Sequence, residues 1–201
     1  MIKSFCAGIC IGLGGLVYLS VENKMVGAFL FSIGLFSVLI FKLDLYTGMV
    51  CKPIVLAEKP SLLVTSLVGN SVGAVYIGLL PSVNHVGFAH DLCINKLNKD
   101  SLEWLVMAIV CGMFIALAVY GWTECKGNYS HIMVVLGVMG FILSGAEHVV
   151  ADAFYFSMAR MITDPDVLIR LLMCAFGNFL GGAFIGYLLS IIKLDEWNNE
   201  M

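Results

Sequence analysis

Six long apolar runs, separated by short polar stretches, make up most of the chain. The runs cover residues 4–21, 25–50, 61–80, 102–122, 132–158 and 167–192. An α-helix rises about 1.5 Å per residue, so roughly 20 apolar residues cross the hydrocarbon core of a bilayer. The pattern predicts an all-α integral membrane protein with six transmembrane helices in one domain, 1–201. A polar connection, 82–101, separates its halves, and a short polar tail, 193–201, follows the last run.

The composition excludes a soluble fold. Hydrophobic residues make up 60% of the chain and charged residues 12%, against about 45–50% and about 25% in soluble domains. The net charge of −3 is spread along the sequence and forms no basic stripe, so no nucleic-acid partner is expected. The seven cysteines contain no C-x-x-C pair, and we interpret them as small buried residues without a disulfide or zinc role.

Two of the runs carry ionisable residues in their interior. Asp44 lies in the second run. The fifth run holds three, shortly after Gly145: Glu147, His148 and Asp152. A charge in mid-membrane costs from a few to more than about ten kcal/mol unless it faces a cavity or a partner. Irregular backbone is tolerated at that depth only where it lines a cavity or is buried in protein. We therefore expect both helices to break beside a cavity.

A G-N-x-x-G motif occurs around Asn70 in the third run and around Asn178 in the sixth. Each copy follows an interrupted run, so three helices are repeated twice. An odd number of spans per repeat inverts the halves, which predicts two inverted three-helix repeats, about 1–81 and 102–192, with a site near the midplane. Amides in lipid need partners, so we expect both asparagines to support the broken helices.

His148 is the candidate for the central chemistry. Its imidazole donates and accepts hydrogen bonds and changes charge near neutral pH, so it could bind a passing anion and exchange a proton with it. A histidine satisfied by a backbone carbonyl is the structural alternative. Glu147 and Asp152 would repel an anion, so we interpret them, with Asp44, as support for the broken-helix ends. A metal site on His148 and Asp152, four residues apart, lacks a third ligand, and no metal or cofactor is expected.

The polar connection also contains residue types that bind metals. These are His85, His90, Asp91 and Cys93. At this spacing in a polar segment we interpret them as solvated surface.

Taken together and in this order, these landmarks resemble the formate/nitrite transporter family. The sequence D-L-Y-T-G at 44–48 matches the motif where the family's second helix breaks, and S-G-A-E-H at 144–148 matches the break in its fifth. The G-N-x-x-G motifs fall where the family has them. Lys96 stands at the spacing of a family lysine in a vestibule, where its positive charge would favour the approach of an anion.

The resemblance implies an aquaporin-like fold and a homopentamer with one pore per subunit, in the cell (inner or plasma) membrane. The pore residues would be His148, Thr47 and Lys96. Bulky apolar residues near the breaks would form constrictions, and the candidates are Phe41, Leu45 and Phe141. The implied cargo is a small monovalent anion such as formate, nitrite, hydrosulfide or a short carboxylate, passing as the weak acid or with a proton.

Three positions depart from the family pattern, which has asparagine where Met49, Gly112 and Asp152 stand. A pore for a neutral solute such as water, glycerol, urea or ammonia is an alternative, although neither Asn-Pro-Ala box of an ordinary aquaporin occurs. An enzyme using Glu147, His148 and Asp152 lacks a positioned nucleophile, so no enzymatic activity is expected.

Overall fold

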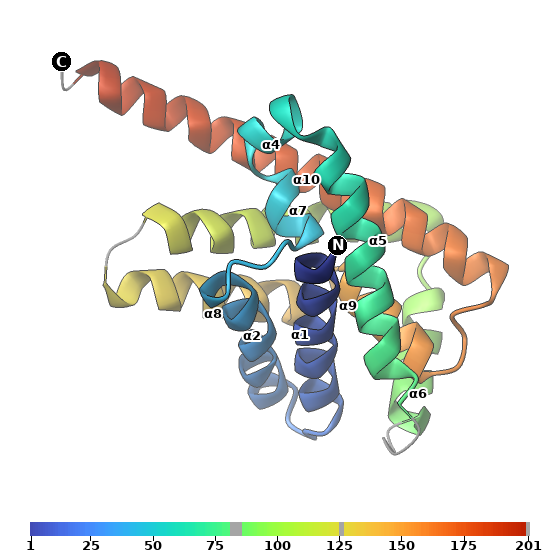
Figure 1. Cartoon of the computed structure of the whole chain (residues 1–201). Helices are drawn as coiled ribbons and strands as arrows, with labels where there is room; N and C mark the ends of the chain where they lie inside the picture. Colours follow the sequence, from blue (N-terminus) through green and yellow to red (C-terminus); the bar gives the residue numbers. More distant parts are fainter. Residues whose placement is uncertain (81–85, 125–126, 200–201) are drawn as a thin grey trace.

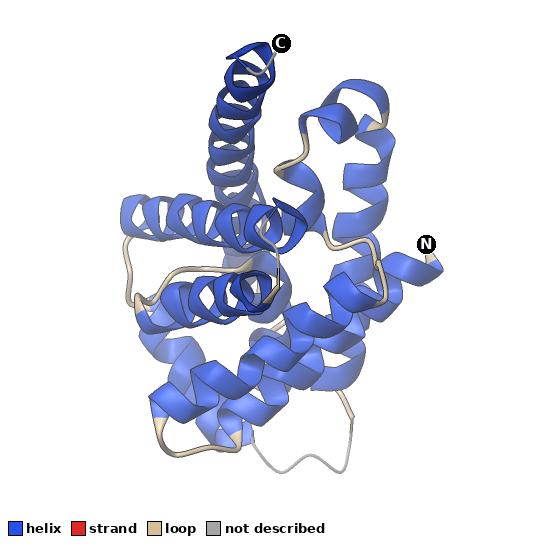
Figure 2. Ribbon diagram, turned by 90° about the vertical axis from the view of Figure 1, so that its left-hand side faces the viewer, coloured by secondary structure: helices blue, strands red, loops and turns tan. Residues whose placement is uncertain are grey.

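The computed structural model describes residues 1–80, 86–124 and 127–199, with 193–199 as helix backbone only. Every regular element in these ranges is a helix (Figure 2). The helices are α1 Ile2–Leu19, α2 Lys24–Ile40, α3 Tyr46–Val50, α4 Pro53–Glu58, α5 Pro60–Gly78, α6 Val86–Leu97, α7 Ser101–Glu124, α8 Asn128–Leu143, α9 Val149–Met158 and α10 Pro165–Asn199.

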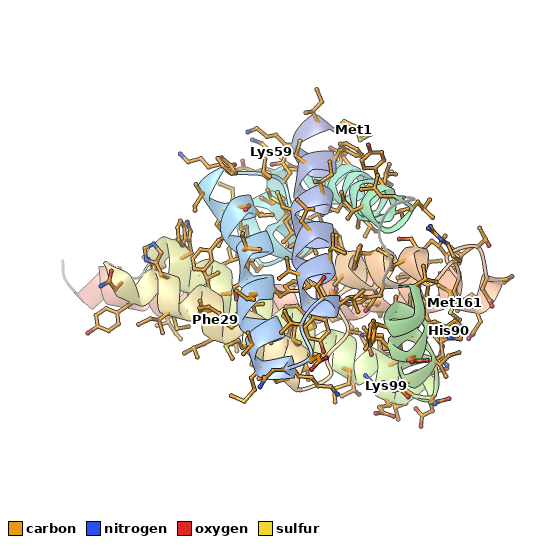
Figure 3. The ribbon with its side chains drawn as sticks, turned by 90° about the horizontal axis from the view of Figure 1, so that it is seen from below. Met1, Phe29, Lys59, His90, Lys99 and Met161 are labelled. Atoms are coloured by element: carbon orange, nitrogen blue, oxygen red, sulfur yellow. The ribbon has the colours of Figure 1, made fainter. Side chains whose placement is uncertain are left out.

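Four helices of the described chain are long and apolar enough to cross a membrane: α1, α5, α7 and α10. The runs predicted at 25–50 and 132–158 are each split in two. The first forms α2 and α3, and the second forms α8 and α9. Large apolar side chains are exposed around the molecule, for example Phe29 on the outside of α2 (Figure 3). Such a surface suits contact with lipid and is rare on soluble monomers.

Both interrupted runs stop in the same way. After α2, Lys42 takes a positive φ of 51°, and the N–H of Leu43 bonds back to the carbonyl of Val38. After α8, Gly145 takes a φ of 72°, and the N–H of Ala146 bonds back to the carbonyl of Phe141. This six-to-one bond around a left-handed residue is the Schellman stop, which satisfies the last carbonyls of a helix. The chain then runs extended to the next helix start.

Each short helix then begins against an asparagine of a long helix. Asn70 of α5 accepts a hydrogen bond from the N–H of Tyr46 (2.7 Å), and its amide donates to the carbonyls of Ser4 (2.7 Å) and Asp44 (2.9 Å). Asn178 of α10 repeats the arrangement at the start of α9. The motifs singled out in the sequence therefore hold the two helix restarts in matching positions.

Each of the two short helices, α3 and α9, packs against long helices from the other half of the chain. The helix α9 packs against α5 and α1, whereas α3 packs against α10 and α7. The helices α1 and α5 pack against each other, as do α7 and α10 (Figure 1). Both pairs approach closely at glycines, among them Gly73 of α5 and Gly181 of α10. A Cβ on Gly112 of α7 would meet the backbone carbonyl of Asn178. The asparagine that the family pattern has at this position therefore does not fit here.

The segment predicted as a polar connection, 82–101, contains the helix α6. Its inner face has Ala89, Cys93 and Leu97 four residues apart, and the first two are fully buried. The interpretation of Cys93 as solvated surface was therefore wrong. The segment is polar on average, and three apolar residues spaced four apart do not stand out in it. Its neighbours His90 and Asp91 are exposed, and His90 points outward (Figure 3). His85 lies outside the described residues.

Candidate functional site

Two side chains from opposite halves of the chain meet at the starts of α3 and α9. Thr47 Oγ1 lies 3.0 Å from His148 Nε2, and the two residues are 101 positions apart in the sequence. Both are buried, with 0% and 2% of their surfaces exposed. Asn70 and Asn178 hold the helices that carry them. The structure thus brings together two of the residues that the sequence placed in a pore.

The hydrogen bonds of His148 define one tautomer of its neutral ring. His148 is the N-cap of α9, and its Nδ1 accepts a hydrogen bond from the N–H of Ala151 (3.2 Å). A ring nitrogen that accepts carries no proton, so the proton of the neutral imidazole sits on Nε2 and points to Thr47 Oγ1. The partners of the histidine are therefore a backbone amide and a hydroxyl, and not the backbone carbonyl of the structural alternative.

An aromatic side chain covers one face of the imidazole. Phe141, the last residue but two of α8, stacks on His148 with the ring centroids 5.5 Å apart. Phe31 of α2 packs edge-on against Phe141, with the centroids 5.7 Å apart. Leu45, the residue before α3, is buried close to Thr47 along the chain. Phe141, with Phe31 behind it, therefore places an apolar wall against one face of the buried imidazole.

Phe41 does not belong to this group. Its side chain is 68% exposed, on the outside of the chain just after α2 ends. Its selection as a constriction residue rested on closeness in sequence to the break. The Schellman stop turns the chain after α2, and Phe41 is left exposed while Leu45, four residues later, is buried. We therefore remove Phe41 from the candidate constriction.

Four charged side chains form a cluster beside the histidine. Lys96 of α6 contacts both Glu147 and Asp152, and its Nζ is 2.9 Å from Asp152 Oδ1. Lys99, just after α6, places its Nζ 2.5 Å from Glu147 Oε1 and 2.6 Å from the carbonyl oxygen of Gly145. Two ammonium groups and two carboxylates are therefore gathered where the chain bends into α9. We call these four residues the charge cluster.

Lys96 lies outside the helices that could span a membrane, and its neighbours maintain its charge. Burial alone would lower the pKa of this ammonium, but the carboxylates of Asp152 and Glu147 outweigh burial and hold the pKa well above its usual value. The ring of Tyr155 lies 5.8 Å from the same Nζ and adds a cation–π contact. Lys96 is thus a fixed cation.

A cavity of about 180 Å³ connects the charge cluster to the histidine. Its lining includes Lys96, Lys99, Phe141, His148, Asp152 and Tyr155. A wider cavity of about 620 Å³, which carries Glu22 and Lys24, shares the lining residues Tyr18, Leu92 and Asn95 with it. We call the smaller cavity the vestibule and the wider one its mouth.

A second, narrow cavity of about 30 Å³ lies beside α3 and is lined by Leu45, Gly48, Met49 and Lys52, among others. The Thr47–His148 pair joins α3, which lines this cavity, to α9, which lines the vestibule. His148 itself lines the vestibule, and Gly48, the residue after Thr47, lines the narrow cavity; each cavity has a lysine in its wall.

Asp44, Glu147 and Asp152 were predicted to support the broken-helix ends, and the structure differs from this prediction in one respect. Asp44 and Glu147 do support the restarts, but with their backbone carbonyls, which accept hydrogen bonds from Asn70 (2.9 Å) and Asn178 (2.8 Å). The side chains of Glu147 and Asp152 instead pair with lysines. The metal alternative is not favoured, because Asp152 faces Lys96 and His148 faces Thr47, and the described residues contain no cluster of three metal-binding side chains.

Sequence reasoning missed Lys99, Tyr155 and Cys174. Lys99 follows Lys96 by three residues, so a helix over this segment would have placed both ammonium groups on one side. Cys174 is buried, and its thiol approaches the carbonyl oxygen of Glu147 (3.2 Å) and Asp152 Oδ2 (3.6 Å). No pattern around the tyrosine or the cysteine distinguishes them from ordinary core residues.

Residues 1–192 match the family model described as "Formate/nitrite transporter". The chain belongs to the formate/nitrite transporter family. It is 26% identical to the formate-nitrite transporter of Plasmodium falciparum (isolate 3D7), covering 98% of this chain and 78% of that protein. It is 23% identical to the nitrite transporter NirC of Escherichia coli (strain K12), covering 92% of this chain and 80% of that one.

Two solved structures share the fold. A structure described as "FNT family ion channel" superposes with a TM-score of 0.83 at 22% identity, covering 95% of this chain and 88% of that one. A "Pentameric formate channel with formate bound" superposes with a TM-score of 0.79 at 22% identity, covering 96% and 95%. These relatives are transporters and channels and not enzymes. Family and apolar helices together make this chain a multi-pass membrane protein of the same channel fold.

Proposed function

We propose that this chain conducts a small monovalent weak-acid anion, such as formate, nitrite, hydrosulfide or a short carboxylate, together with a proton. The observation that carries the proposal is the buried Thr47–His148 pair: His148 lines the lysine-walled vestibule, and Thr47 lies in α3, whose Gly48 and Met49 line a second cavity. The family and the formate bound to one structural relative support the choice of cargo.

We further propose that the whole chain is one channel domain of six spans in two inverted three-helix repeats, about 1–81 and 102–192, in the cell membrane. The matched Schellman stops and the matched contacts of Asn70 and Asn178 support this arrangement. In an inverted repeat the two short helices enter the midplane from opposite sides, with their N-termini toward the centre. Helix N-termini carry partial positive charge, which favours an anion there.

The conduction step follows from the apolar side chains at the centre. A bare anion loses its hydration among Phe141, Leu45 and the imidazole, whereas the neutral acid has far less to lose. The anion first collects near Lys96 in the vestibule, where the ammonium replaces part of its water shell. It takes up a proton there or at the histidine, and the neutral acid then passes Thr47 and His148. The Nε2–H and the threonine hydroxyl offer it hydrogen bonds on the way.

Assembly as a homopentamer belongs to the same proposal. One structural relative is described as pentameric. Large apolar side chains on the outer faces of α2, α5 and α10 supply surface for subunit contacts as well as for lipid. Each subunit would keep its own pore, because the vestibule and the Thr47–His148 pair are complete within one chain.

Flux through reconstituted vesicles tests the proposal. Purified protein in sealed vesicles should pass formate or nitrite down a gradient, chemically unchanged, and should exclude glycerol and urea. Thr47→Val keeps the shape of the threonine and removes its hydroxyl, so it should slow formate at least about tenfold if that hydroxyl is used in passage. Thr123→Val, near the end of α7, is the matched control. Vesicles that pass glycerol faster than formate, or that convert formate to another compound, would contradict the proposed function.

A further inference from the structure

Asp152 is the least satisfied member of the charge cluster. Its side chain is 1% exposed, and the one ammonium group close to it in the described chain is that of Lys96, whose Nζ lies 2.9 Å from Oδ1. Oδ2 receives only the weak thiol donor of Cys174 at 3.6 Å. Glu147, in contrast, receives an ammonium group on each carboxylate oxygen. A buried carboxylate with so few donors is costly to keep ionised.

The charges of the cluster cancel when all four groups are ionised. Lys96 and Lys99 supply two positive charges, and Glu147 and Asp152 supply two negative charges. Lys99 donates to Glu147 and to the carbonyl of Gly145. An anion that approaches Lys96 therefore meets Asp152 already beside it. The vestibule has no excess positive charge to offer until one carboxylate is neutralised.

We propose that Asp152 accepts the proton that accompanies the anion into the vestibule. The carboxylate takes a proton from a hydronium ion of the solution that enters through the mouth, and becomes a neutral carboxylic acid. Lys96 is then released from its partner and pairs with the incoming anion, so that one proton and one anion have entered together. When the proton moves from Asp152 to the anion, the neutral acid leaves for the constriction and the Asp152–Lys96 pair forms again. No charge remains behind after one cycle.

The position of Asp152 suits this role. It lies in the first turn of α9 and lines the vestibule with Lys96 and His148, so proton and anion share one chamber. Other titratable or charged groups surround it on its own helix and on the elements packed there. They are Tyr18 of α1, Cys93 and Lys96 of α6, Cys111 of α7, Glu147 and His148 before α9, Tyr155 of α9, Cys174 of α10, and Lys99 after α6. Among them Lys96 alone contacts both carboxylates.

Binding of nitrate distinguishes a proton taken up by the protein from a proton taken up by the cargo. The inference rests on the proposed function, because it names the group that loads the proton. Nitrate stays an anion between about pH 5 and 8, so any proton taken up when it binds must go to the protein. Calorimetry of nitrate binding in two buffers of different ionisation enthalpy measures that proton directly. On the alkaline side the wild type should take up close to one proton per nitrate, and the dissociation constant should rise about tenfold per pH unit.

The variants identify the group. Asp152→Asn should bind nitrate without proton uptake and with less than about a twofold change in dissociation constant across the range. Asp152→Glu should restore the uptake, and Asp91→Asn on the exposed face of α6 should behave as the wild type. Proton uptake that persists in Asp152→Asn would overturn the inference. A wild type that takes up no proton would overturn it as well, and this measurement does not depend on whether the asparagine variant assembles. Absence of formate flux in the wild type would instead contradict the proposed function, since nitrate binding is measured without flux.

Discussion

Replacement of Asn178 by leucine should destabilise the start of α9 strongly. The leucine is similar in size but removes three hydrogen bonds: those to the N–H of Val149 (3.0 Å) and to the carbonyls of Ala108 (2.8 Å) and Glu147 (2.8 Å). The N–H of Val149 would be left without a partner, which costs about 1–3 kcal/mol, and each of the two lost carbonyl bonds contributes about 0.5–1.5 kcal/mol. The carbonyl of Glu147 keeps the thiol of Cys174 at 3.2 Å. The loss is therefore at least about 2 kcal/mol, which corresponds to a fall in Tm of at least about 4 °C for a chain of this size.

Thermal unfolding of the purified protein in detergent, followed by intrinsic fluorescence, measures this fall. Asn98→Leu is the matched control, because Asn98 is exposed just after α6 and its side chain has no such contacts in the described structure. Asn70→Leu should cost as much as Asn178→Leu, because it breaks the equivalent three bonds at α3. The reasoning is refuted if Asn178→Leu unfolds within about 2 °C of Asn98→Leu.

Three further predictions concern the vestibule and the helix crossing. Lys96→Glu should depress formate uptake most at low ionic strength, and a salt-independent loss would point to misfolding instead. Lys99→Gln leaves the charge cluster with one excess negative charge, which repels an anion some 6–8 Å away by about 2–3 kcal/mol. The KM for formate should therefore rise at least about tenfold without loss of the oligomer. An unchanged KM in uptake assays would remove Lys99 from the site. Gly112→Asn should abolish assembly on size-exclusion chromatography because α10 leaves no room for a side chain, whereas a stable oligomer would contradict the observed crossing.

The sequence was informative where a buried polar group is costly. Asp44 and Glu147 marked the two interruptions, and the asparagines marked the contacts that hold the restarts, because such residues persist in apolar helices only with partners. His148 and Thr47 were placed in one site on family motifs, and the structure puts them 3.0 Å apart. These expectations depend on residue type and order along the chain.

Expectations about which way a side chain faces, or which distant segments meet, were less accurate. Phe41 and Leu45 are both bulky and both follow α2, but only the backbone turn at Lys42 decides which of them faces inward. The pairing of Asp152 with Lys96 joins α9 to α6, a helix that the average polarity of its segment concealed. Charge pairs between distant segments leave no local pattern in the sequence. The zero net charge of the charge cluster could therefore be recognised only from the structure.

The central claim is that the cargo crosses the Thr47–His148 constriction as a neutral acid. Formate uptake into vesicles of the wild-type protein, measured at fixed pH while a potassium gradient and valinomycin set the membrane potential, tests it most directly. The account predicts that the uptake rate is independent of the potential and that one proton enters with each formate. A rate that rises when the interior is made positive and falls when it is made negative would show that the bare anion crosses, and would contradict the account.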